Sequence, residues 1–532
     1  MSVPITPPGS PQRLRDAWIA LAGLSAVFLF EMLDNSVLTV ALPTIGRDLG
    51  ASTSALQWVS GAYSLAFGGL MLLFGAVADR FGRRRVMLVG LVLLAGVSVA
   101  TLAVTSVEGL VVVRALTGVA AAMTTPGAMA LAFRLFDAED LRVRALTVIS
   151  TAGLVGLAVG PTVGGLVLAV APWQVLLVAN APVAVVAFVG IRAGITADHV
   201  TDMRRDPVDV LGAVLGTATV AGVLVTPTVA VAAGGQADGA AGGPAGSPLL
   251  WCMVAATLAA ATAFVARQRT ADAPLLDLRL VARPLVASGL LYKAAAGLAT
   301  AGLSWTVTLQ LQVVWGWPPA LAAVGTLPQV VVLLVSGRFV GPFVRRVGLR
   351  TAAWTSSVAV VLGLAVSVVA TPLGYPVVVV ALVLVAAGMR VVGAVAGAEV
   401  LAGLPADRTS VGAALVDTAS EVATAAGVAV AGTVLAALVP GAVAAAHLDA
   451  AHRAAVGGAL SVAGVALTVV AAALVVAGML RARQHATAAA PATEQSDDQP
   501  AARPATGRPG AVPAAHPPVT PSHHTDQESA DV

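Results

Sequence analysis

Gly75-Ala76-Val77-Ala78-Asp79-Arg80-Phe81-Gly82-Arg83-Arg84-Arg85 is a short basic stretch between two long apolar segments of the chain. An apolar segment of about 20 residues crosses the hydrocarbon core of a bilayer, roughly 30 Å thick, as a helix. Arginines in a short loop resist translocation, so this loop is expected on the cytoplasmic side of the membrane. The stretch therefore predicts a membrane protein and fixes the orientation of its helices.

The composition of the chain independently favours a membrane protein. Of the 532 residues, 58% are hydrophobic and 11% are charged, which leaves too little polar surface for a soluble protein of this size. The net charge is only +3, and no basic patch indicates a nucleic-acid partner. Cys252 is the only cysteine, which excludes an intrachain disulfide and a cysteine metal cluster. We expect no metal, no cofactor and no enzymatic site.

Hydropathy along the chain predicts fourteen membrane spans. They begin near Trp18, Ala55, Val86, Gly109, Ala145, Trp173, Val210, Leu249, Leu285, Leu321, Ala352, Val377, Val411 and Ala455. Arginines of the later loops then gather on the side of Arg83, whereas Arg47 and Arg453 fall opposite. An even number of spans puts both termini on one side, the cytoplasmic one, in a multi-pass protein of the cell membrane.

The predicted spans suggest an all-α domain organisation. We expect two six-helix bundles, at 17–192 and 284–483, with two additional helices and their connections at 193–283. Residues 1–16 form a cytoplasmic amino terminus, and residues 484–532 have the composition of a disordered cytoplasmic tail. The segment Gly234 to Ser247 is read as a flexible connection without function.

A degenerate repeat of the opening stretch supports two related halves. Gly341 and Gly348 keep the spacing of Gly75 and Gly82, while Arg345 takes the place of Asp79. Such internal repeats are common in transporters. Asp79 itself is expected to pair with Arg80, Arg83 or a neighbouring helix end and to act as a gate, the alternative being a loop that only sets topology.

The fifth predicted span carries a row of small residues. Gly153, Gly156, Gly160 and Gly164 are three or four residues apart, so they share one helix face that a partner helix can approach closely. Pro161 can weaken the helix and provide a place to bend. The face is therefore expected to slide or rock during transport, the alternative being close packing without movement.

Charged residues inside the predicted spans are the strongest candidates for function, because each costs at least ~2.5 kcal/mol on insertion scales. Glu31 and Asp34 are three residues apart in the first span, and Asp417 and Glu421 are four apart in the thirteenth, so the two acidic faces can meet in one cavity. The full set of candidates is Glu31, Asp34, Arg114, Lys293, Arg390, Asp417 and Glu421.

Several other polar residues lie near the ends of predicted spans. Arg338 and Glu399 are expected to snorkel to the cytoplasmic interface. Trp305, Gln310 and Gln312 are further candidates for the wall of the pocket, although a tryptophan near a span end is more often an interfacial anchor.

The chain lacks the sequence that would let it use ATP. Lys293 is its only lysine and follows Tyr292, so no phosphate-binding Gly-Lys-Ser/Thr loop exists. An ion gradient, or a separate subunit, must drive any transport. None of the seven histidines lies in a predicted span, so a proton relay within the membrane would have to use the carboxylates.

Four motifs together resemble the major facilitator superfamily, and more closely its fourteen-helix drug:proton antiporter branch. They are Gly75 to Arg84, Leu33 to Pro43, Arg114 to Gly118, and the Gly-x-x-x-Gly-Pro-x-x-Gly-Gly run from Gly156 through Pro161 to Gly165. Ser36, Thr39 and Thr117 depart from the usual residues of the branch. The resemblance implies gating by Gly75, Asp79, Arg80, Gly82, Arg83 and Arg84, and an antiporter helix that contains Gly153, Gly156, Gly160, Pro161, Gly164 and Gly165.

The resemblance implies proton-coupled export of small amphipathic or hydrophobic compounds, such as drugs, antiseptics or endogenous antibiotics, by alternating access. It also links Asp34 and Arg114 to the coupling of protons and substrate. The expected partners are a small molecule, protons and the lipid bilayer, with the protein acting as a monomer. The alternatives are a dedicated exporter of one metabolite and a non-transporting membrane sensor or scaffold.

Overall fold

The computed structural model describes residues 13–136, 138–198, 208–235, 247–272, 274–405, 409–439 and 449–489. Those residues form helices and turns and contain no strand, in agreement with the predicted all-α class. The amino terminus up to residue 12, most of the predicted connection at 236–246 and the predicted tail from residue 490 lie outside the described residues. The chain divides into two units, Met1–Ala486 and Thr487–Val532, and the helix bundle belongs to the first.

The helices follow one another with short connections. The first part of the chain contains η1 Leu14–Ala17, α1 Trp18–Asp48, α2 Thr53–Phe81, α3 Arg83–Ala100, η2 Thr101–Ala103, α4 Val107–Leu135, α5 Glu139–Leu168, α6 Gln174–Val178 and α7 Asn180–Gly194. The middle contains α8 Val210–Gly235, α9 Pro248–Thr270 and α10 Leu278–Val281. The last part contains α11 Pro284–Leu309, a π-helical turn η5 Gln310–Val314, α12 Pro319–Gly325, α13 Leu327–Val347, α14 Leu349–Ser367, α15 Ala370–Leu373, α16 Tyr375–Ala402, α17 Thr409–Leu438 and α18 Ala450–Ala489.

Fourteen stretches of the described residues are helical, long and apolar enough to cross a membrane, which confirms the predicted number. Their beginnings lie close to the predicted ones: the second starts at Thr53 and the seventh at Val210. Serine side chains define several of these starts. Ser52 accepts a hydrogen bond from the Ala55 amide at 3.2 Å, and Ser106 accepts one from Gly109 at 3.1 Å, as expected for helix N-caps.

The repeated glycines mark two equivalent turns. Gly82 ends α2 and starts α3 with φ +99°, and Gly348 ends α13 and starts α14 with φ +83°. Residues other than glycine rarely adopt a backbone conformation with positive φ, so glycine is favoured at both turns. The degenerate sequence repeat is therefore also a structural repeat.

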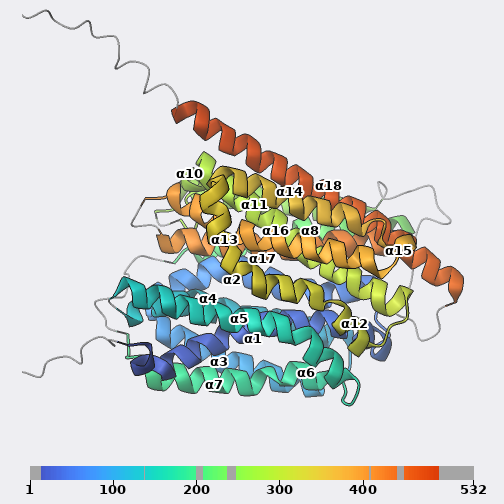
Figure 1. Ribbon diagram of the computed structural model, residues 1–532, viewed down its shortest axis with the longest axis horizontal. Coiled ribbons are helices and arrows are strands. Elements are labelled where there is room, and N and C mark those ends of the chain that lie inside the picture. Colours follow the sequence, from blue (N-terminus) through green and yellow to red (C-terminus); the bar gives the residue numbers. More distant parts are fainter. Residues whose placement is uncertain are drawn as a thin grey trace, which may run out of the picture. The chain divides into compact units, whose positions relative to one another are not determined.

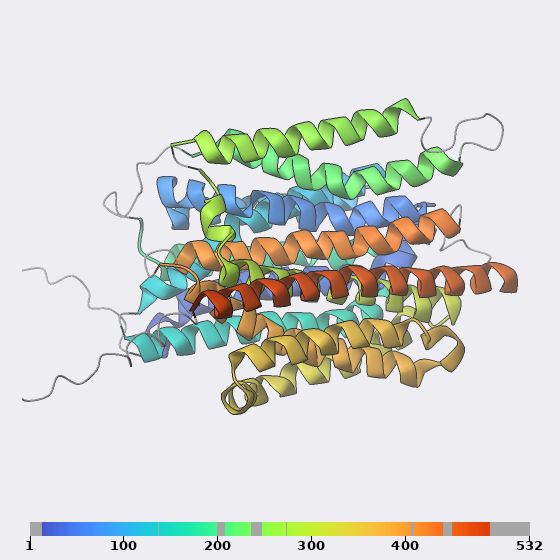
Figure 2. The ribbon, with the colours of Figure 1, turned by 90° about the horizontal axis from the view of Figure 1, so that it is seen from above.

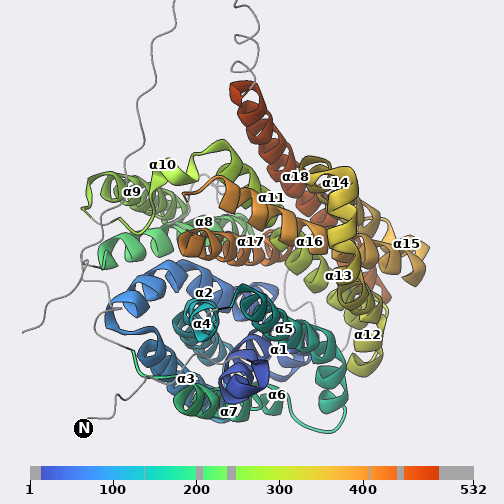
Figure 3. The same cartoon turned by 60° about the vertical axis from the view of Figure 1, so that its left-hand side comes forward.

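The long helices run side by side (Figure 1), and their contacts divide them into two groups and a flanking pair. Figure 3 shows α1 to α7 together, with α11 to α18 opposite them. Within the first group α1 packs on α5 and α2 on α4, and within the second α11 packs on α17 and α14 on α16. The pair α8 and α9 lies outside, with α8 against both α2 and α17 and α9 against α8 (Figures 2 and 3).

The two groups of helices contact each other along α2 and α17, and again at the end of the bundle opposite the Gly82 turn. Gln312 Nε2 of η5 donates to the carbonyl oxygen of Val40 on α1 at 3.0 Å. A Cβ at Gly165 of α5 would lie 2.8 Å from the carbonyl oxygen of Pro319 on α12. These close approaches hold the groups together at this end, and a cavity lies between them.

Candidate functional site

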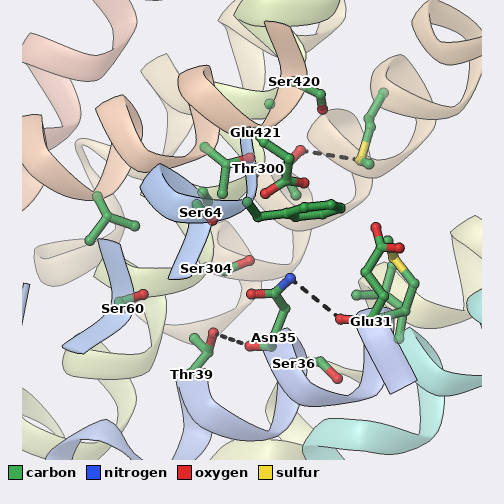
Figure 4. A pocket seen from close by; sticks show the side chains of 18 of the residues that line it. Glu31, Asn35, Ser36, Thr39, Ser60, Ser64, Thr300, Ser304, Ser420 and Glu421 are labelled. Atoms are coloured by element: carbon green, nitrogen blue, oxygen red, sulfur yellow. Dashed lines mark hydrogen bonds between the residues drawn. The ribbon is translucent and has the colours of Figure 1, made fainter. Parts of the chain in front are cut away.

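The cavity between the two groups has a volume of about 310 Å³. Its wall comes from both halves of the chain, chiefly from α1 and α2 on one side and from α11 and α17 on the other (Figure 4). Four charged side chains line it: Glu31, Lys293, Asp417 and Glu421. The expectation that acidic residues of the first and thirteenth spans meet in one cavity is thus fulfilled by three carboxylates.

Helical periodicity explains why these residues face the cavity. On α1, Glu31, Asn35 and Thr39 are four residues apart and lie on one face. On α17, Asp417 and Glu421 have the same spacing, and the face continues to Thr424. Each wall thus presents a polar stripe to the cavity, although the helices themselves are mostly apolar.

Glu31 lines the cavity with its carboxylate hydrogen-bonded to a neighbouring helix. Its Oε2 accepts a hydrogen bond from Thr125 Oγ1 of α4 at 3.0 Å, and its side chain is 6% exposed. In the same stripe Asn35 donates to the Glu31 carbonyl oxygen at 3.4 Å, and Thr39 donates to the Asn35 carbonyl oxygen at 2.9 Å (Figure 4). The carboxylate of Glu31 is therefore held by a hydroxyl group and by no ion pair within the described residues.

Glu421 lies where the two groups of helices cross. Gly68 of α2 faces it, and a Cβ at position 68 would come within 2.9 Å of the Glu421 Cβ. Ser64 of α2 lies beside the Glu421 carboxylate (Figure 4), whose buried Oε2 has no hydrogen-bond partner among the described residues. A glycine at position 68 thus lets α2 approach α17 closely next to an incompletely paired acid.

Asp34 and Arg114 form a second polar centre that is not part of the cavity wall. Arg114 Nη1 donates to Asp34 Oδ2 at 2.6 Å, and Asn180 Nδ2 donates to Asp34 Oδ1 at 2.6 Å. Arg114 is 1% exposed and lies over the Tyr63 ring, 4.7 Å from its centroid. The structure brings this predicted pair together but separates it from the cavity. Its role in coupling stays a prediction.

Other charged candidates lie away from the cavity. Arg390 is half-buried and packs against Gly337 of α13. The expectation that Glu399 snorkels is wrong, because its side chain is 4% exposed and accepts a hydrogen bond from Ser288 at 3.1 Å. Arg338 is exposed, as expected, with its guanidinium 4.8 Å from the Phe339 ring centroid.

Of the three polar or aromatic candidates in the ninth span, one lines the cavity and two do not. Trp305 lines the cavity. Gln310 instead accepts a hydrogen bond from Thr371 at 3.0 Å, and Gln312 bonds to Val40.

The basic turn between α2 and α3 is tied to the end of α7. Asp79 pairs with Arg83 at 2.8 Å, one of the predicted partners. Arg84 Nη2 donates to the Arg192 carbonyl oxygen at 2.7 Å, and the Asp198 carboxylate accepts from the backbone amide of Arg85 at 3.2 Å. Asp198 was not predicted, because in the sequence it is only an isolated acid after the sixth span. Its carboxylate caps the start of α3.

The glycine face of α5 packs within one group of helices. A Cβ at Gly156 would lie 2.6 Å from the Leu29 carbonyl oxygen, and one at Gly160 would collide with Ser36 Oγ, so both glycines are needed for contact with α1. Gly153 and Gly164 also face α1, with more room. Gly165 faces α12, across the interface. Close packing on α1 thus requires glycine at positions 156 and 160, while Gly165 meets the other half of the protein.

The hydroxyl groups of the cavity were missed in the sequence. Thr125, Ser64, Thr300 and Ser304 all line it. Serine and threonine occur throughout apolar helices, where they often bond to their own backbone, so their types alone do not distinguish a cavity wall from an ordinary helix surface. Helical spacing from a charged residue would have been the only available signal.

Comparison with known families and proteins adds independent findings. The sequence model of the Major Facilitator Superfamily matches residues 24–428. The puromycin resistance protein pur8 of Streptomyces alboniger is 36% identical over 314 residues, a match that covers 58% of this chain and 59% of pur8. The cephamycin export protein CmcT of Amycolatopsis lactamdurans is 33% identical over 340 residues, 64% of this chain and 68% of CmcT.

A longer but less similar match is the multidrug efflux pump LfrA of Mycolicibacterium smegmatis, 29% identical over 434 residues, which covers 81% of this chain and 83% of LfrA. Among solved structures, a bacterial homologue of the human lysosomal transporter Spinster, inward-facing and unoccupied, has a TM-score of 0.62 at 17% identity, covering 88% of this chain and 98% of that one. The POT family transporter PepTSo has the same TM-score at 16% identity, covering 90% and 99%. At these identities the structures indicate a shared fold.

Proposed function

Because the chain belongs to the major facilitator superfamily and is therefore a multi-pass membrane transporter, we propose that it is a proton-coupled antiporter. It exports small amphipathic or hydrophobic compounds across the cell membrane by alternating access. The observation that carries this proposal is the cavity itself, in which Glu31 of the first group of helices faces the same space as Asp417 and Glu421 of the second.

Exchange follows from the cost of an uncompensated charge. An ionised carboxylate in a site of low dielectric constant requires a counter-charge, and otherwise it takes up a proton. Protons and a cationic compound can each neutralise Glu31 and Glu421, and the two compete for the same groups. Binding of one therefore favours release of the other, which is the requirement for antiport.

The lining supports an amphipathic organic cargo. Four of the ten methionines of the chain line the cavity, together with aromatic residues that include Phe28 and Phe67. Methionine side chains are flexible and polarisable, so they adapt to cargo of different shapes. The names of the relatives include resistance to puromycin and methyl viologen and export of a cephamycin, and we extend the property of export to this chain.

We further propose the orientation and the movement. The turn with Arg83 faces the cytoplasm, as do both termini, and the end where Gly165 meets Pro319 faces outward. The bundles 17–192 and 284–483 rock about the cavity, and the segment 193–283 adds the flanking pair α8 and α9. When the cavity opens to the outside, the contacts between the two groups at the outer end break, and new contacts between the groups form near Gly82.

The proposal is tested with purified protein in liposomes that contain a pH-sensitive dye. A pH gradient is imposed, and a panel of compounds is added: the dication methyl viologen, the amine puromycin and the acid cephamycin. We expect the cationic compounds to collapse the gradient in the wild type, and Glu31→Gln or Glu421→Gln to reduce the rate at least about tenfold, since each removes a group that alternates between proton and cargo. A wild-type protein that moves none of the panel under a gradient contradicts the proposal.

Glu399→Gln is the matched control, because Glu399 is also a buried carboxylate of a membrane span but lies away from the cavity. It should keep the wild-type rate. Equal losses in Glu399→Gln and Glu421→Gln would mean that removal of any buried acid disturbs the protein, and the assignment to the cavity would then fail. Collapse of the gradient by one compound alone would favour a dedicated exporter.

A further inference from the structure

Lys293 is the one positive charge among the residues that line the cavity. It lies on α11 next to Tyr292, which is 3% exposed and whose ring packs against Gly478 of α18. The backbone at this point is therefore held firmly, while the lysine side chain extends on four methylene groups toward the cavity. Every other basic residue of the chain apart from histidine is an arginine.

The setting of Lys293 differs from that of Arg114. Arg114 has a carboxylate partner at 2.6 Å and an aromatic ring over its guanidinium. Lys293 has no ion pair within 4.0 Å among the described residues, but it lines the same cavity as Glu31, Asp417 and Glu421. A compact ammonium group on a flexible stem can approach more than one of these carboxylates.

We propose that Lys293 is a tethered counter-ion that competes with a cationic cargo for the cavity carboxylates and so determines which charge of cargo binds. This inference rests on the proposed function. With its four charged groups ionised, the cavity has a net charge of −2. When cargo leaves, the ammonium group partly compensates the carboxylates. When a cation binds beside the carboxylates, the ammonium group repels it.

This role predicts a dependence on cargo charge that packing alone does not produce. The repulsion between Lys293 and a bound ion is proportional to the charge of that ion. Removal of the lysine charge should therefore strengthen binding of a dication by twice the free energy gained by a monocation, so the fold-change for the dication is about the square of that for the monocation. Binding of an anion should weaken.

The test measures equilibrium binding to the full-length protein in nanodiscs at pH 8, with wild type, Lys293→Met and Lys293→Arg. The probes are tetraphenylphosphonium, its nearly isosteric anion tetraphenylborate, and methyl viologen. We expect Lys293→Met to bind tetraphenylphosphonium about tenfold and methyl viologen about a hundredfold more tightly, and tetraphenylborate about tenfold more weakly. Lys293→Arg, which keeps the charge, should stay within about twofold of wild type for all three.

Arg338→Met controls for the loss of a positive charge elsewhere, because Arg338 is exposed on α13, and it should leave all three affinities unchanged. Equal changes for the three probes in Lys293→Met would overturn the proposal in favour of a packing role. Weaker binding of tetraphenylborate with unchanged cation binding would instead make Lys293 an anion site, which also overturns it. If the wild-type protein binds neither cation, both the proposed function and the role of Lys293 are contradicted. If it binds the cations but Lys293→Met has the same affinities for all three probes, only the role of Lys293 is contradicted.

Discussion

Two carboxylates of α1 lie three residues apart and have opposite surroundings. Asp34 is buried against α4 and α7, where Arg114 and Asn180 each donate to one of its oxygens at 2.6 Å. Glu31 lines the cavity and accepts a hydrogen bond from the neutral Thr125. Asp34 thus has a charged partner in direct contact, whereas Glu31 faces the cavity with only a hydroxyl partner among the described residues. Under the proposed function, the charge of Glu31 is the one that a proton or a cargo molecule can neutralise.

The same contrast indicates how each acid should respond to mutation. A buried ion pair contributes little compared with an apolar pair of the same size, but loss of one partner leaves an uncompensated charge that costs about 3–5 kcal/mol. Glu31 is in direct contact with a hydroxyl group and, within the described part of the chain, with no cation. Its neutralisation therefore does not deprive a buried positive charge of its partner. The two substitutions should therefore differ in stability even though both remove one negative charge from the same helix.

The largest effect is expected for Asp34→Asn. It leaves Arg114 buried without its carboxylate, so the protein should lose about 3–5 kcal/mol of stability and most of its folded yield. Glu31→Gln should lose less than about 1 kcal/mol, because glutamine can still accept the hydrogen bond from Thr125. Thermal unfolding of the two variants in the same detergent measures the difference.

A double variant, Asp34→Leu with Arg114→Met, sharpens this result. If the loss in Asp34→Asn comes from the orphaned arginine, removal of both charges should restore much of the stability. Equal melting temperatures for Asp34→Asn and wild type would remove the structural role of the pair. If such a stable variant also kept normal antiport in liposomes, Asp34 would have no part in coupling either.

An intermediate effect is expected where α5 supports the cavity face of α1. Gly160 faces Ser36, a residue of the cavity wall, with no space for a side chain. Gly160→Leu should push the helices apart, cost about 1–3 kcal/mol and reduce transport more than insertion, because the displaced face carries Glu31. Melting temperature, membrane content and liposome transport are compared with Gly164→Ala, whose added Cβ would have an ordinary 3.5 Å contact with Val37. Unchanged transport in Gly160→Leu would mean that close packing of α5 on α1 is not required for transport.

The sequence was sufficient for the features that depend on local pattern. Long apolar stretches predicted all fourteen spans, and the repeated glycine spacing indicated two related halves, in which Gly82 and Gly348 occupy equivalent turns. Local pattern could not distinguish Glu31 from Asp34. Residues three apart on a helix point about 60° from each other, and which of them meets a neighbouring helix is decided by the docking of α4 and α7. Glu399 shows the same limit, because its burial depends on the approach of Ser288 from α11.

Outside the membrane spans, Asp209 is another carboxylate with a charged partner. It caps α8 by accepting from the Gly212 amide at 3.0 Å, and it also accepts from Arg267 Nε at 3.0 Å and from Gln268 Nε2 at 3.2 Å, both on α9. Burial acts to raise the pKa of Asp209, but these hydrogen bonds and the charge of Arg267 outweigh it and lower the pKa below its usual value. Unlike Arg114, Arg267 is partly exposed, with 42% of its side-chain surface accessible.

The smallest effect is therefore expected for Asp209→Asn, which keeps the cap but removes the charge. We expect a loss of about 1 kcal/mol, confined to the α8–α9 pair and seen as about fivefold faster hydrogen exchange at the first turn of α8. Because the folded pKa is lowered, the wild-type stabilisation is present above the unfolded value of about 3.9 and is lost as the pH falls through the folded value, so the difference between wild type and variant should disappear in acid. Asp277→Asn, the cap of the short α10, serves as the control and should not alter exchange in α8. A loss as large as that of Asp34→Asn would mean that burial of the partner is not what separates the paired acids of this protein.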